Sequence, residues 1–340
     1  MATTYKEIQD TFHALNKTAT YLDEKWDDIA AFLSGKTRFV FVGCGSSYSL
    51  AKSLASICSM HTGIPASALA AGDILLHAAR YKKVADGAAI VCVSRSGRTS
   101  ELIMALDALS AEGVSMSVLS IAAAEGTPMG EKSNLSLATP WAFDESVCQT
   151  RTVTNFYFIG AYIFAKYTAD EATLANLHEL LKSGATFLAP AEALAKELAD
   201  KPWSRAVVLA DAELDGIAEE GALVFKEVCQ LPANYYHALD SRHGPMVLFG
   251  EDTLILYALG TNSELEHKLI SDYRAKNAPV IVFSDLPVPG VSDISFGQAL
   301  TQVAKGIPFI ILCQLIAYEK SKVTGTDPDN PTGLEAWIAL

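Results

Sequence analysis

Two short turns rich in hydroxyl side chains each follow directly on an apolar run. Residues 43–47 come after the run 38–42, and residues 94–99 come after the run 88–93. Behind each turn the apolar positions take up helical spacing, so each turn is predicted to join a strand to a helix. Backbone N–H groups, the positive end of a helix dipole and several hydroxyls would then converge on one small volume. The turns therefore predict a site for a phosphate monoester.

Strand-like and helix-like segments alternate along the chain, which predicts parallel strands joined by crossover helices. An amphipathic helix pair is expected over residues 5–33. The first series has expected strands at 38–43, 66–70, 88–93 and 115–120, and expected helices at 48–61, 100–112 and 151–167. The second series has expected strands at 205–210, 234–238, 253–259 and 279–284, and expected helices at 215–229, 263–276 and 297–320.

The second series repeats the order of the first, which indicates an internal duplication. Residues 38–51 align with 205–218, and residues 88–120 align with 252–284. We expect an α/β fold with two tandem, doubly wound parallel-sheet domains of the flavodoxin-like kind. The expected parts are a helical segment at 1–35, a first domain at 36–168, a helical connector at 169–202, and a second domain with a C-terminal tail at 203–340.

The alignment also separates the two halves in function. Gly43, Gly45, Ser46 and Ser47 of the first half become Ala210, Ala212, Glu213 and Leu214 in the second. These changes remove backbone freedom and two hydroxyls, and they add a carboxylate that repels phosphate. We therefore expect the first half alone to keep the anion site.

Composition restricts the partners. A net charge of −13 and the lack of a basic run argue against nucleic-acid binding, so the phosphate partner should be small. The six cysteines show no Cys-x-x-Cys spacing, which favours a reducing cytoplasm. No apolar stretch is long enough to cross a bilayer and the N-terminus has no apolar signal core, so we expect neither membrane nor export roles.

The two turns resemble the phosphate loops of the sugar isomerase (SIS) domain family. They read Gly-Cys-Gly-Ser-Ser-Tyr and Ser-Arg-Ser-Gly-Arg-Thr-Ser-Glu. Lys226-Glu227 and His243-Gly244-Pro245 are similar to signatures of the isomerase half of glucosamine-6-phosphate synthase, and His243 follows Glu227 by sixteen positions as in that enzyme. Residues 327–331 resemble its C-terminal Asp-x-Pro segment. The resemblance covers residues from about 36 to 340, a size shared with tagatose-6-phosphate ketose/aldose isomerase-like proteins.

The resemblance implies a role for each matching residue. Glu227 falls on the base that moves a proton between C1 and C2, and His243 falls on the residue that assists ring opening. In the family this histidine comes from the partner subunit, which implies a homodimer. Gln149 and Thr150 fall in a loop that closes the ligand pocket. The implied phosphate contacts are Ser47, Ser94, Arg95, Ser96 and Thr99, with Ser46 as a weaker candidate.

The chemistry is also accessible from first principles. Aldose–ketose interconversion passes through a cis-enediol, so one carboxylate above C1 and C2 can shuttle the proton without a metal or cofactor. Apolar neighbours on its helix would raise the pKa of Glu227. Plainer readings remain open from the residues alone: Glu227 as an exposed helix residue, His243 as a loop histidine, and residues 145–152 as a helix-capping segment.

Two departures from the family pattern narrow the activity. Ala336 stands where the synthase has a lysine that handles the sugar carbonyl, and no glutaminase domain precedes residue 36. We therefore expect no synthase reaction. An isomerase, an amino-sugar-6-phosphate deaminase and a fructosamine-6-phosphate deglycase all remain open as activities. A sugar-phosphate-sensing regulatory protein of the same fold is the non-enzyme alternative.

Overall fold

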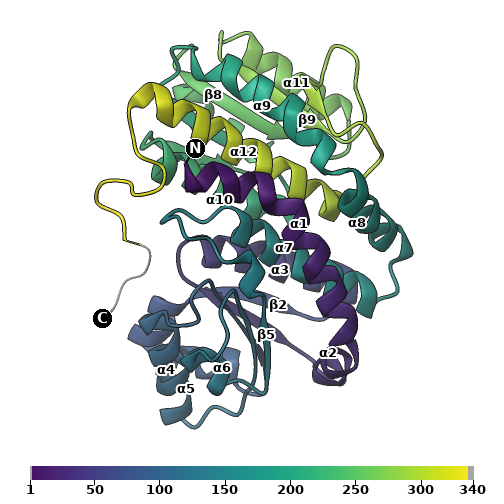
Figure 1. Ribbon diagram of the computed structural model, residues 1–340, viewed down its shortest axis with the longest axis vertical. Coiled ribbons are helices and arrows are strands. Elements are labelled where there is room, and N and C mark those ends of the chain that lie inside the picture. The colour runs from purple at the N-terminus through teal and green to yellow at the C-terminus, as the bar shows by residue number, and fades with distance from the viewer. Residues whose placement is uncertain (1, 336–340) are drawn as a thin grey trace. The chain divides into compact units, whose positions relative to one another are not determined.

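The computed structural model describes residues 2–335, and within them the chain divides into two compact units (Figure 1). The N-terminal unit comprises Asp10–Glu145 and Arg151–Leu174. The C-terminal unit comprises Ala175–Leu334, Ser146–Thr150 and the residues up to Gln9. Each unit has a five-stranded parallel sheet among its described residues.

The sheet of the N-terminal unit has the order β2-β1-β3-β4-β5. Its strands are β1 (Phe39–Gly43), β2 (Ala66–Ala70), β3 (Ala89–Ser94), β4 (Ser117–Ala122) and β5 (Leu135–Ala138). Its helices are α2 (Trp26–Leu33), α3 (Ser46–Thr62), α4 (Ala71–Ala85), α5 (Ser100–Ala111), α6 (Pro128–Glu131) and α7 (Arg151–Tyr167). Helix α1 (Thr3–Glu24) begins in the C-terminal unit and continues in this one.

Alternation along β1 sends side chains to two separate cores. Val40 and Val42 pack with residues of α4 and α5 in one buried cluster. Phe39 and Phe41 point to the other face, where both meet Phe164 of α7 edge to face. Because both faces are covered by helices, the central strands β1 and β3 are buried along their whole length rather than alternating between buried and exposed residues.

The sheet of the C-terminal unit has the order β10-β9-β8-β6-β7, which is the same connection order. Its strands are β6 (Arg205–Leu209), β7 (Ala233–Tyr236), β8 (Thr253–Ala258), β9 (Val280–Ser284) and β10 (Ile294–Ser295). Its helices are α9 (Ala185–Ala199), α10 (Asp215–Val228), α11 (Glu264–Arg274) and α12 (Gln302–Thr324), with α8 (Glu171–Ser183) entering from the other unit.

Helices cover both faces of this second sheet as well. Leu269, Ile270 and Tyr273 of α11 share one core with alternate residues of β6, β8 and β9. On the opposite face, Gly221 of α10 lies so close to Val208 and to Cys313 of α12 that an added Cβ would meet them at 3.2 and 3.0 Å. Phe283 of β9 contacts Phe309 of α12 on that face.

The expected elements agree with the observed ones to within a few residues, with four additions besides the short 3-10 helices. Helices α4 and α6 and the edge strands β5 and β10 were not predicted. Leu76 of α4 is 76% exposed and the helix is kinked at His77, so α4 lacks a clean apolar stripe. Strands β5 and β10 are too short to give a period-two pattern.

The loop after β8 contains a buried carboxylate, Glu266, in the first turn of α11. Ser263 and Glu266 form a reciprocal capping box, and Glu266 also accepts hydrogen bonds from Gly260 N–H at 2.7 Å and from the Tyr257 hydroxyl at 2.6 Å. Burial alone would raise the pKa of Glu266, but the bonds from Ser263, Tyr257, Thr261 and Gly260 lower it to about 2.

This depressed pKa predicts a pH-dependent stability. The ionised form of Glu266 is favoured in the folded state, so its stabilisation is complete above the ordinary glutamate pKa near 4.5 and is lost as pH falls toward 2. In urea unfolding, Glu266→Gln should have a lower free energy of unfolding than wild type at neutral pH. The difference between the two free energies should become smaller in acid. A free-energy difference that stays constant from pH 7 to about 3 would contradict the lowered pKa of Glu266.

Candidate functional site

The first hydroxyl-rich turn joins β1 to α3, and the structure places Ser46 and Ser47 in the first turn of that helix. Both serines are buried, at 5% and 4% exposure. Gly45 has a φ of +53°, which turns the chain sharply into the helix. A Cβ on Gly43 would collide with the backbone of Ser47, so only glycine allows the strand end to approach the helix this closely.

The second turn joins β3 to α5 and is built around hydroxyl contacts. Ser94 Oγ lies 2.8 Å from Thr99 Oγ1 and accepts the N–H of Gly97 at 3.1 Å. Ser96 Oγ accepts the N–H of Arg98 at the same distance. Gly97 has a φ of +61°, and a Cβ there would meet Thr127 at 2.5 Å.

Strand register brings these two turns to one edge of the sheet. Val42 of β1 pairs with Cys92 of β3, so Cys44 and Ser94 leave the sheet at the same level. The sheet order reverses its winding between β1 and β3, which is the switch point where open α/β sheets bind ligands. Burial, followed by the charge of Glu101, raises the pKa of Cys44 to about 11, so its thiol stays neutral beside any anion.

Arg95 lies in the second turn but is buried rather than projecting into solvent. It is 5% exposed, its guanidinium lies 5.8 Å above the ring of Phe143, and it donates to the carbonyl of Asp144 at 3.4 Å. Arg98, by contrast, is exposed. Arg95 therefore places a positive charge beside residues 143–144 and ties the turn to them within the same unit.

The predicted catalytic pair lies in the C-terminal unit. Glu227 is half-buried on the last turn of α10, beside the exposed Lys226. His243 is exposed and ends a short 3-10 helix, η3 (Asp240–Arg242). Gly244 follows with a φ of +128°, and Pro245 opens the next short helix, η4 (Pro245–Leu248). This backbone turn fixes the point from which the imidazole projects.

The loop that carries Gln149 and Thr150 is held within the C-terminal unit by three elements. Glu7 of α1 is buried and accepts hydrogen bonds from the N–H and the hydroxyl of Ser146. The carbonyl of Asp329 accepts the N–H of Val147 at 3.1 Å. Gln314 of α12 donates to the carbonyl of Thr150 at 3.0 Å. Gln149 is half-buried and its Oε1 lies away from solvent.

The C-terminal tail links this loop to the end of α10. Thr326 Oγ1 donates to the carbonyl of Val228, and the carbonyl of Thr332 accepts from Gln230 Nε2 at 2.9 Å. These two contacts bracket the end of the helix on which Glu227 lies. Ala336, the position of the absent lysine, lies outside the described residues.

Asp329 anchors the tail, and sequence reasoning missed it together with Glu7 and Gln314. Its carboxylate accepts the N–H groups of Thr3 and Thr4 at 2.7 and 2.8 Å, which caps α1. Burial raises the pKa of Asp329, but these N–H donors outweigh burial and lower it below the ordinary value. A contact across more than 320 residues leaves no local sequence signal. Only the resemblance of residues 327–331 to the family's C-terminal Asp-x-Pro segment pointed to this part of the chain.

Within the described residues, neither a membrane-spanning helix nor a metal-binding cluster is present. No helix within residues 2–335 is long and apolar enough to cross a membrane. In the same residues no group of three or more His, Cys, Asp or Glu side chains is placed to hold a metal ion.

Replacing each glycine of the first turn with alanine should distinguish a steric clash with Ser47, expected at Gly43, from backbone strain, expected at Gly45. Gly43→Ala should weaken sugar-phosphate binding by at least about tenfold, because Ser47 must move. Gly45→Ala meets no neighbour but must keep a φ of +53° with a ψ of −128°, so backbone strain should cost about 1–3 kcal/mol of stability and much less affinity. Calorimetric titration measures the phosphate affinity of each variant, and urea unfolding measures its stability. Equal losses of affinity would contradict the close-approach argument.

Comparison with known proteins agrees with this architecture. The SIS domain family matches residues 32–164. Glutamine–fructose-6-phosphate aminotransferase (isomerizing) of Escherichia coli K12 is 26% identical over 98% of this chain, which spans 58% of that enzyme's length. The chain thus covers a little over half of the curated relatives it matches.

Solved structures share the fold over nearly the whole chain. Glucosamine-6-phosphate deaminase from Thermotoga maritima superposes with a TM-score of 0.81 at 24% identity, covering 100% of both chains. Tagatose-6-phosphate ketose/aldose isomerase from Escherichia coli superposes with a TM-score of 0.79 at 20% identity, covering 98% of this chain and 96% of that one. Residues 32–164 are therefore a SIS domain, and the chain is homologous to the isomerase part of the glucosamine-fructose-6-phosphate aminotransferases.

Proposed function

We propose that the protein is a phosphosugar isomerase, or an amino-sugar-6-phosphate deaminase or deglycase, that moves a proton between C1 and C2 of a ketose or aldose 6-phosphate. The observation that carries this proposal is the pair of hydroxyl and N–H turns at the switch point between β1 and β3. A phosphate there would meet buried serine hydroxyls and the positive end of α3.

Each site residue has a proposed role. The phosphate is held by the first-turn residues Ser46 and Ser47 and by the second-turn residues Ser94, Arg95, Ser96 and Thr99. Arg95 contributes positive charge, and its guanidinium lies over the ring of Phe143. Gln149 and Thr150 contact the sugar hydroxyls, from a loop that Glu7 and Gln314 hold in place.

The proposed chemistry is a proton shuttle. The Glu227 carboxylate takes the proton from the first carbon, the C–H electron pair forms the C1=C2 double bond, and the carbonyl oxygen gains a proton to give the enediol. When the enediol collapses, the hydroxyl on the first carbon loses its proton as the new carbonyl forms, and the Glu227 carboxyl delivers a proton to the other carbon. The carboxyl exchanges its proton with solvent during the lifetime of the enediol, so solvent hydrogen enters the product. His243 exchanges a proton with the ring oxygen and the anomeric hydroxyl as the sugar ring opens. No metal or cofactor takes part in these steps.

The enzyme is favoured over the sensor alternative for two reasons. A sensor needs the phosphate turns but neither Glu227 nor His243. The solved relatives named above are a deaminase and an isomerase rather than regulators. The choice among isomerase, deaminase and deglycase depends on the groups that contact the C2 substituent of the sugar.

The proposal extends to the second domain, assembly and location. We take the C-terminal unit to be a second, duplicated SIS domain, with domain limits at 36–168 and 203–340. The left-handed φ of Ala212, +56° against +53° for Gly45, supports the alignment of the halves. Val247 and Leu248 are 79% and 63% exposed just after His243, as expected if a homodimer covers them. All six cysteines are free thiols, which suits the cytoplasm.

Removing hydroxyls should locate the phosphate. Ser96→Ala with Thr99→Val should weaken binding of fructose 6-phosphate and glucosamine 6-phosphate by at least about tenfold without unfolding the protein, because hydrogen bonds to a charged group are lost. The matched control, Ser263→Ala with Thr261→Val, removes two hydroxyls from the corresponding loop of the C-terminal unit and should leave affinity unchanged. Unchanged affinity in the first variant would remove the phosphate assignment.

Replacing the base should abolish proton exchange. In D₂O, the wild type should wash deuterium into C1 or C2 of its sugar phosphate, and Glu227→Gln should reduce that rate by about 10²–10⁴-fold while binding persists. Lys226→Ala alters the adjacent exposed residue and should leave exchange nearly intact. If wild type and Glu227→Gln show the same negligible exchange over a broad panel of bound sugar phosphates, the protein is a sensor.

A further inference from the structure

A pocket of about 540 Å³ lies at the carboxyl edge of the second sheet, within the C-terminal unit. It opens between the ends of β6 and β8, the switch point of that sheet and the topological counterpart of the phosphate turns. Leu209 pairs with Tyr257, so the loops that begin at Asp211 and Leu259 leave the sheet at one level. The pocket therefore occupies the position where a second phosphate would be expected.

An internal carboxylate occupies the anion-binding position of this pocket. Glu266 is 7% exposed and accepts the N–H groups of Gly260, Thr261 and Ser263 at 2.7, 3.1 and 2.8 Å. The hydroxyls of Tyr257, Thr261 and Ser263 donate to it at 2.6, 2.8 and 3.0 Å. A capping box accounts for the Ser263 contacts alone. The donors at 257, 260 and 261 make a complete oxyanion cradle around one carboxylate.

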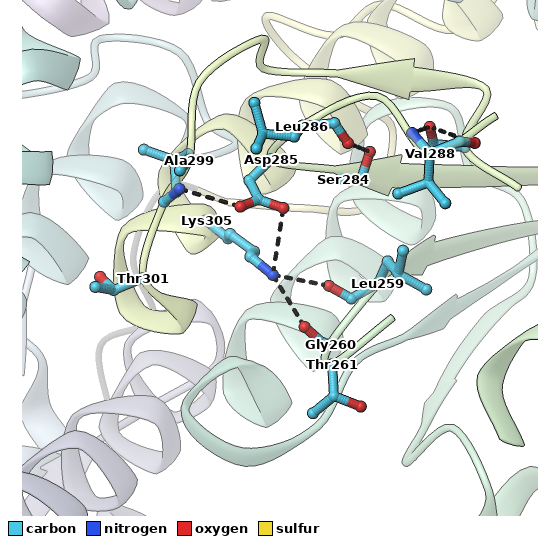
Figure 2. Close-up of polar contacts among 12 residues, drawn as sticks. Leu259, Gly260, Thr261, Ser284, Asp285, Leu286, Val288, Ala299, Thr301 and Lys305 are labelled. Atoms are coloured by element: carbon cyan, nitrogen blue, oxygen red, sulfur yellow. Dashed lines mark hydrogen bonds and ion pairs between the residues drawn. The ribbon is translucent and has the colours of Figure 1, made fainter. Parts of the chain in front are cut away.

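Lys305 of α12 fixes the orientation of the cradle from the other side. Its ammonium donates to the carbonyls of Leu259 and Gly260 at 3.1 and 3.0 Å and lies 3.7 Å from Asp285 (Figure 2). In a trans peptide the C=O and N–H point in opposite directions. Because Lys305 binds the carbonyl sides of these two peptides, their N–H sides, on Gly260 and Thr261, are turned toward Glu266.

The N-terminal unit differs at the matching position. Ser263 is the N-cap residue of α11 and Thr99 holds the same position before α5, although only Ser263 makes a side-chain cap hydrogen bond. Glu266 and Leu102 therefore occupy the same place, three residues into each helix. Leu102 is 1% exposed and packs into the apolar core beneath the turn. The N-terminal turn thus has no carboxylate at this position. In the C-terminal turn, the Glu266 carboxylate lies within hydrogen-bond distance of the donors on residues 257, 260, 261 and 263.

We propose that Glu266 is a specificity-determining residue that fills an anion cradle in the C-terminal unit, so that each chain binds a single phosphate and binds it in the N-terminal unit. The cradle itself remains intact and preorganised by Lys305. Removing the carboxylate should open it to small oxyanions. Phosphate as the excluded ligand rests on the proposed function, whereas the filled cradle does not.

The test is chemical rescue in the full-length protein carrying Ser96→Ala and Thr99→Val, so that the N-terminal site contributes little. Thermal midpoints are measured against increasing formate and inorganic phosphate, with chloride held at matched ionic strength. The variants are Glu266→Ala, which empties the cradle, Glu266→Gln, which keeps it filled by an amide, and Glu264→Ala, which removes an exposed carboxylate from the same helical turn.

Glu266→Ala should be destabilised and should regain its midpoint as formate or phosphate is added, because an anion that binds only the folded state stabilises it. Glu266→Gln and Glu264→Ala should show no such rise. Adding Lys305→Met to Glu266→Ala should diminish the rescue. Equal anion responses of Glu266→Ala and Glu266→Gln would overturn the proposal.

A second measurement decides the matter if Glu266→Ala does not fold. The Ser96→Ala/Thr99→Val protein with Glu266 intact is titrated with inorganic phosphate, with and without Lys305→Met. No phosphate binding in either form supports a cradle closed by Glu266. Binding that is lost only with Lys305→Met would reveal an open site in the C-terminal unit and overturn the proposal. Binding that survives both changes would instead count against the phosphate turns of the proposed function.

Discussion

The backbone N–H groups at the carboxyl edge of each parallel sheet are the constraint on which the rest of this structure depends. Where a strand ends and the chain turns into a helix, those N–H groups point away from the sheet and have no partner in the ladder. They must be satisfied by side chains, by water or by an anion. The N-terminal unit surrounds them with serine and threonine hydroxyls, and the C-terminal unit satisfies them with the Glu266 carboxylate.

This difference explains how one architecture can serve two purposes. The two sheets share a strand order, and Gly45 and Ala212 both have a positive φ, so the frames are alike. The N-terminal frame stays open to an anion because its turns use neutral hydroxyls. The C-terminal frame is closed by its own charge, and Glu227 at the end of α10 and His243 after η3 are the residues for which we propose chemistry on the sugar.

Sequence patterns predicted the parts of the fold that have local causes. The apolar runs that became β1, β3, β6 and β8 are buried on both faces, so they stand out in composition without any long-range knowledge. Helix α4 was not predicted because Leu76 is exposed and the helix is kinked at His77, so its apolar residues do not follow a continuous helical spacing. The turn residues were predicted from hydroxyl content and position. Glu266, Asp329 and Glu7 were not, because their partners are set by tertiary contacts or by a loop read as an ordinary helix start.

The central claim is that phosphate binds at the switch point of the first sheet and not at that of the second. The most direct measurement is a crystal structure of the protein soaked with a ketose 6-phosphate. The account predicts phosphate density within hydrogen-bond distance of Ser96 and Thr99, with Glu266 still in contact with Gly260 and Ser263. Phosphate density beside Lys305, with Glu266 displaced, would contradict it.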